Sequence, residues 1–80
     1  MSKDIDFQII RDNRHVCTVT YHDNKSLYDY LQARGKKSLC CEALCDMERN
    51  SFDNNLVNRK LVPVLMQYIK NGYSVTVNFV

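Results

Sequence analysis

The chain has 80 residues, of which 45% are hydrophobic and 25% are charged, and its formal net charge is +2. A chain of this length has room for one domain, which buries roughly 60 to 65% of the surface that the unfolded chain exposes. With two glycines and one proline, the composition excludes a low-complexity or disordered chain. We therefore expect a single globular domain over residues 1–80.

Location and redox state are predicted from the same composition. The start of the chain has no apolar segment of the kind that directs secretion, and the longest apolar run, residues 61–66, is too short to cross a membrane. We expect a cytoplasmic protein without membrane contact. Its four cysteines are then expected to be reduced thiols that serve mainly as small apolar side chains.

Alternation of apolar and polar residues predicts a β-hairpin at the start of the chain. Apolar residues occupy every second position from Ile5 to Ile9, as expected for a strand with one buried face. A polar turn follows at residues 12–14. The next alternating set then comprises Cys17, Val19 and Tyr21.

Two helices are predicted in the middle of the chain. Asp23 or Asn24 can cap a helix that ends at Gly35, because Asp and Asn favour the N-cap and Gly favours the position after the last turn. Ser38 can begin a second helix, which runs to about Asn50.

Three of the four cysteines lie in this second predicted helix. At about 100° per residue, Cys40 falls on the apolar arc of the helix, whereas Cys41 and Cys45 lie one turn apart on the other side, beside Glu48. We expect Cys40 in the core and the other two thiols partly exposed.

The clearest helical period lies near the end of the chain. Apolar residues recur at intervals of three and four from Leu61 to Ile69, and Asn71-Gly72 follows as a stop signal. Pro63 fits the first turn, so the helix is expected to begin near residue 60 or 61, after a looser connection over residues 52–59. A last strand is predicted from the alternating residues Val75, Val77 and Phe79.

The order strand, strand, helix, helix, helix, strand predicts an α+β fold. We expect a small two-layer domain in which the N-terminal hairpin and the C-terminal strand form a three-stranded antiparallel sheet, with two to three helices on one face. The other face would be open to water or to a partner. Its residues are Gln8, Thr18, Thr20, Thr76 and Asn78. Two strands must lie at sheet edges, where unpaired backbone groups would permit a homodimer.

The residues that could carry chemistry are few. His15 and Cys17 are two apart on a predicted strand and would share a face. A thiol beside an imidazole is the nucleophile and base of cysteine enzymes, but no glycine-rich loop accompanies this pair. Cys41 and Cys45 could bind zinc with Cys17 or a histidine, although the usual zinc knuckles with two intervening residues are missing. We expect no cofactor, no metal and no enzymatic activity.

The function that these observations favour is binding to a larger protein, as an adaptor or inhibitor of the type that phages and mobile elements often encode. The alternative is a nucleic-acid-binding regulator that uses the basic residues at 34–37 and 59–60, for which a net charge of +2 is small. The candidate contact residues for a partner are Thr18, Thr20, Tyr30, Arg34, Lys36, Lys37, Phe52, Arg59 and Lys60.

Overall fold

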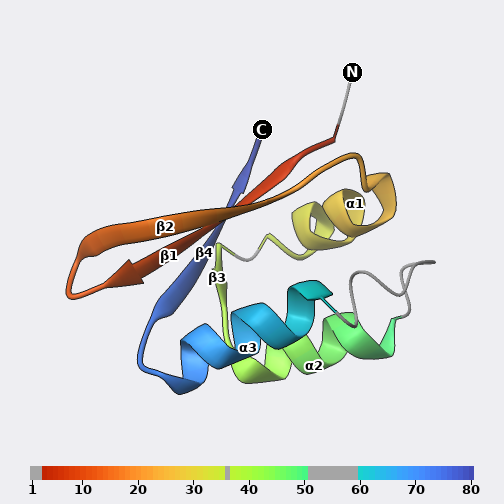
Figure 1. Cartoon of the computed structure of the whole chain (residues 1–80). Helices are drawn as coiled ribbons and strands as arrows, with labels where there is room; N and C mark the ends of the chain where they lie inside the picture. Colours follow the sequence, from red (N-terminus) through yellow and green to blue (C-terminus); the bar gives the residue numbers. More distant parts are fainter. Residues whose placement is uncertain (1–2, 36, 51–59) are drawn as a thin grey trace.

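A computed structural model describes residues 3–35, 37–50 and 60–80. The elements in chain order are β1 (Ile5–Arg11), β2 (Arg14–Tyr21), α1 (Lys25–Arg34), β3 (Ser38–Leu39), α2 (Cys41–Arg49), α3 (Val62–Lys70) and β4 (Ser74–Phe79). Figure 1 shows the strands crossing the upper part of the molecule and α2 and α3 lying side by side below them. The predicted α+β class and antiparallel sheet are confirmed. The sheet has four strands rather than three, in the order β2-β1-β4-β3.

The additional strand is β3, which occupies the position where a helix was expected to begin. Ser38 pairs with Thr76 and Leu39 pairs with Val75, both antiparallel. The N–H of Val77 also donates to the carbonyl of Lys37 at 2.7 Å. A strand of two residues is too short to show a period of two, so only its pairing with β4 reveals it.

The β1–β2 hairpin turns over two residues. Asp12 and Asn13 have φ values of 53° and 63°, and the register pairs Arg11 with Arg14 directly across the turn. Two successive residues in the left-handed region are the signature of the tight turn whose twist matches that of the flanking strands. Asp and Asn tolerate this conformation better than most residues.

A β-bulge at Val16 interrupts the hairpin. The register is regular from Ile5 to Ile9, which pairs with Cys17, but Ile10 pairs with His15. Val16 is therefore an extra residue in β2, and it is 51% exposed. Because the bulge adds one residue between them, His15 and Cys17 lie on opposite faces of the sheet, and the prediction that they share a face is wrong.

Both ends of α1 follow the predicted capping residues, whereas α2 ends near Asn50 as predicted but does not begin at Ser38. Asn24 Oδ1 accepts a hydrogen bond from the N–H of Leu27 at 2.9 Å, and Gly35 ends α1 in the left-handed conformation with φ 63°. In α2 the N-cap is Cys40, with extended backbone. Since β3 directs Leu39 into the core, the next residue along the extended chain points away from it.

Cys40 is consequently exposed rather than part of the core. The prediction that placed it on an apolar arc is wrong because Cys40 precedes the first helical residue of α2. Cys41 is half-buried and Cys45 is exposed, as expected for the polar side of the helix.

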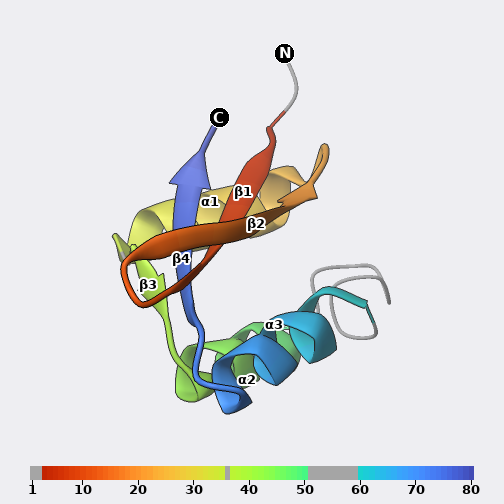
Figure 2. The same ribbon diagram turned by 60° about the vertical axis from the view of Figure 1, so that its left-hand side comes forward.

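The core lies between one face of the sheet and the three helices. Phe7, at the centre of β1, is fully buried, and α1 and α3 contribute Leu27 and Leu65, which are also fully buried. Figure 2 shows α1 behind the sheet and the opposite face free of helices. Among the residues that the structure describes, no helix combines the length and the hydrophobicity needed to cross a membrane.

Candidate binding surface

The outer face of the sheet carries Thr18 and Thr20, and both are exposed. Thr20 Oγ1 donates to Asp6 Oδ1 at 2.8 Å, and Thr18 Oγ1 lies 2.7 Å from His15 Nε2. Both hydroxyls are therefore already hydrogen-bonded to neighbours on the sheet. The face is open, but these two side chains are satisfied without a partner.

Tyr30 and Arg34 lie together on α1. The Arg34 guanidinium lies 3.9 Å from the centroid of the Tyr30 ring, a cation–π contact between residues one helical turn apart. With residues of β3 and α2 they line a depression of about 10 Å³, which is the size of one water molecule. This pair therefore lines a shallow depression that is too small to admit a partner's side chain.

The remaining predicted contact residues do not join either group. Lys37 and Lys60 are exposed and precede β3 and α3, respectively. Lys36, Phe52 and Arg59 lie outside the described residues. The residues proposed from the sequence therefore do not converge on one site.

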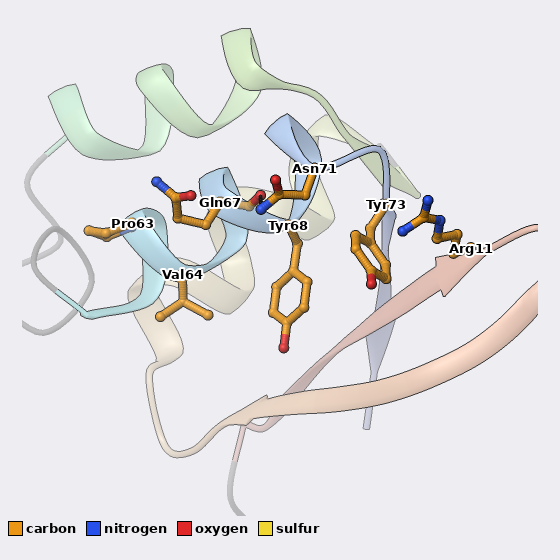
Figure 3. A pocket seen from close by; sticks show the side chains of 7 residues that line it. All are labelled: Arg11, Pro63, Val64, Gln67, Tyr68, Asn71 and Tyr73. Carbon is orange, nitrogen blue, oxygen red and sulfur yellow. Dashed lines mark hydrogen bonds between the residues drawn. The ribbon is translucent and has the colours of Figure 1, made fainter.

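A larger pocket, of about 730 Å³, lies between α3 and the end of the β1–β2 hairpin (Figure 3). Pro63 and Gln67 of α3 and Asn71 at its C-cap follow each other at intervals of four and so form one stripe along the helix. We call this pocket and its lining the hairpin–helix surface. Its residues are Arg11, Pro63, Val64, Gln67, Tyr68, Asn71 and Tyr73.

Two tyrosines and an arginine form one side of the pocket. The rings of Tyr68 and Tyr73 meet edge to face, with centroids 5.4 Å apart, which is a favourable arrangement of the two quadrupoles. The Arg11 guanidinium lies 5.1 Å from the centroid of the Tyr73 ring. The ring of Tyr73 thus connects the hairpin to α3 through contacts that hold Arg11 at the pocket.

The turn after α3 brings Tyr73 back to Tyr68. Gly72 has a φ of 89°, a conformation that glycine adopts without strain. The N–H of Tyr73 donates to the carbonyl of Tyr68 at 3.0 Å, and Asn71 N–H reaches the carbonyls of the last turn. These bonds end the helix in the left-handed manner predicted from Asn71-Gly72.

Tyr68 also joins α3 to β2. The Cys17 sulfur and the Tyr68 hydroxyl oxygen form a hydrogen bond, at a sulfur–oxygen distance of 3.5 Å. The pKa of Tyr68 is raised above its ordinary value of 10.0, first by the hydrogen bond with Cys17, then by charge repulsion from Cys17, partial burial and Tyr73. Tyr68 therefore stays a neutral phenol beyond the pH at which a free tyrosine ionises.

The metal site and the catalytic pair considered from the sequence are not formed among the described residues. No group of three or more His, Cys, Asp or Glu side chains among them could hold a metal ion. Cys17 faces the helices and contacts Tyr68, whereas His15 contacts Thr18 on the outer face. The nucleophile and base considered from the sequence are not brought together.

Sequence reasoning missed most of this surface. Arg11 adjoins the predicted turn, and Tyr73 follows the predicted helix stop. Gln67 lies in a mainly apolar helix, and Asn71 is its C-cap. Only their spacing of four, with Val64 beside them, could have indicated a mixed polar and apolar stripe on α3. Comparisons with known protein families, curated proteins and solved structures give no match, so the assignment rests on geometry and chemistry.

Proposed function

We propose that this chain is a non-enzymatic protein-binding module that contacts a larger protein through the hairpin–helix surface. The observation that carries the proposal is the open pocket of about 730 Å³ and the kinds of residue that line it. Tyr and Arg are enriched at the energetic centres of protein interfaces, whereas Lys, Asp and Glu are depleted there. The lining holds two Tyr and one Arg, and it contains none of the depleted types.

Val64 supplies the apolar part of this surface. It is 43% exposed although it belongs to the hydrophobic repeat of α3. An exposed valine in the lining of an aromatic pocket favours a protein partner, because burying it on association removes apolar surface from water.

The experiment is site-specific crosslinking. A photoreactive amino acid replaces Val64 or, as a control, Val80, which is 64% exposed and lies after β4. In a lysate of the cells that produce the chain, we expect a protein adduct at position 64 and none at position 80.

Two further variants test the same proposal against the adduct partner once it has been purified. Val64→Asn should weaken binding by about tenfold or more, as expected for truncation of a central interface residue, and Val80→Asn should leave it unchanged. Adducts that disappear after nuclease treatment and at high salt would instead favour the nucleic-acid alternative. A chain that elutes as a dimer, with the position-64 adduct formed to a second copy, would contradict a larger partner.

A further inference from the structure

Two arginines lie opposite each other at the end of the hairpin. Arg11 and Arg14 are directly paired across the two-residue turn, and directly paired residues of antiparallel strands share a face of the sheet. Because Arg11 lines the pocket, Arg14 lies on the same, helix-facing side. Their Cβ atoms are then about 4.5 to 5.5 Å apart, a distance at which like charges repel.

No carboxylate among the described residues compensates this pair. The nearest acidic residue in the sequence is Asp12, in the turn itself, and no ion pair joins it to either arginine in the described part of the chain. The helix α3 contributes Lys70 and no acidic residue. The ion pairs found among the described residues are His22–Asp4, Lys25–Asp29 and Arg49–Asp46.

We propose that Arg11 and Arg14 bind the carboxylate of an Asp or Glu side chain of the partner protein, while an apolar neighbour of that residue packs against Val64. The inference rests on the proposed function and adds the chemistry of the partner segment. A carboxylate placed between two guanidinium groups removes their repulsion and accepts charge-assisted hydrogen bonds from both. The contact with Tyr73 already orients Arg11, so less side-chain entropy is lost on binding.

A carboxylate fits this surface better than a nucleic-acid backbone. Non-specific strand binding needs a track of several cations and aromatic faces on which bases stack. Here the positive charge is confined to the end of the hairpin, and the α3 part of the lining is uncharged. The ring of Tyr73 already contacts Arg11 and the ring of Tyr68.

The probe that tests the inference is a phage library of short random peptides selected on the purified chain. We expect enriched peptides to share an Asp or Glu beside an aliphatic or aromatic residue. Arg11→Gln and Arg14→Gln should each lower the affinity of these peptides by about tenfold or more, because truncating one partner of a charged pair leaves the other unpaired. Changing the peptide's Asp to Asn should lower its affinity for the wild-type chain by a similar factor. The same change should lower its affinity for Arg11→Gln much less, because that variant has already lost the contact.

Arg34→Gln is the matched control. It removes the same charge from an arginine that also stacks on a tyrosine, and it should leave peptide affinity unchanged. Circular dichroism of all three variants checks that each one folds.

The other outcomes overturn the inference in distinguishable ways. Peptides that depend on Val64 but carry no acidic residue would refute the carboxylate contact and leave the proposed function standing. Peptides that depend on neither Val64 nor Arg11 would refute both. If Arg34→Gln lowers the affinity of the selected peptides and Arg11→Gln does not, the contact lies on α1 instead. If an oligonucleotide displaces the peptides and binds with equal affinity, a nucleic-acid partner is favoured.

Discussion

Replacing Phe7 with alanine tests the assignment of the two faces of the sheet. Phe7 is fully buried at the centre of β1, where it pairs with Val19 on one side and Val77 on the other. The adjacent Gln8 pairs with threonines on the outer face. Two neighbouring residues of one strand therefore occupy opposite environments, and Gln8→Ala is the matched control.

The magnitude follows from burial. Removing a buried Phe side chain costs about 3 to 5 kcal/mol, because the transfer free energy is lost and a cavity is left. A domain of 80 residues has a total stability of about 4 to 12 kcal/mol, so Phe7→Ala removes a large share of it. Since 1 kcal/mol shifts the Tm of a domain of this size by about 4 to 8 °C, the Tm should fall by about 12 to 40 °C. Gln8→Ala should cost less than about 1 kcal/mol.

Urea denaturation followed by far-ultraviolet circular dichroism measures both variants. If Phe7→Ala does not fold, Phe7→Leu provides the measurement, because it keeps most of the apolar volume and should cost clearly less than the alanine variant. Equal midpoints for the variants at positions 7 and 8 would refute the assignment of the inner face to Phe7, and with it the core described above.

Three further changes test the capping, the pocket and the cysteines. Asn24→Ala should lose the N-cap of α1 and lower the free energy of unfolding by about 1 kcal/mol. Asn24→Ser keeps an accepting oxygen and removes the buried Nδ2, which has no hydrogen-bond partner among the described residues. Equal urea midpoints for the two variants would contradict the capping role of Asn24. The raised pKa of Tyr68 means that the folded chain holds the phenol proton more tightly than the unfolded chain, so stability should fall as pH rises above about 10 and through the folded pKa. In an ultraviolet titration, Cys17→Ala should move the Tyr68 transition to lower pH, and an unchanged transition would show that Cys17 is not the cause. A thiol reagent should label the exposed Cys40 and Cys45 before Cys17, as read by peptide mass spectrometry, and the reverse order would refute the placement of Cys40 outside the core.

Local patterns in the sequence were sufficient for most of the elements. Alternation identified β1, β2 and β4 because one face of each strand packs toward the core, and the spacing of three and four identified α3 for the same reason. The cap at Asn24 and the stop signals at Gly35 and Asn71-Gly72 depend on backbone chemistry that acts over a few residues, so they too were predicted correctly.

Contacts between distant segments decided the rest. The pairing of Ser38 and Leu39 with β4 replaced a predicted helix start and placed Cys40 outside α2, and the bulge at Val16 separated His15 from Cys17. The hairpin–helix surface likewise depends on α3 and the end of β1 coming together, more than 50 residues apart in the chain. A pattern within one segment records which side of that segment is buried, but it carries no information on which other segment covers it, and for this reason the candidate site emerged only from the tertiary structure.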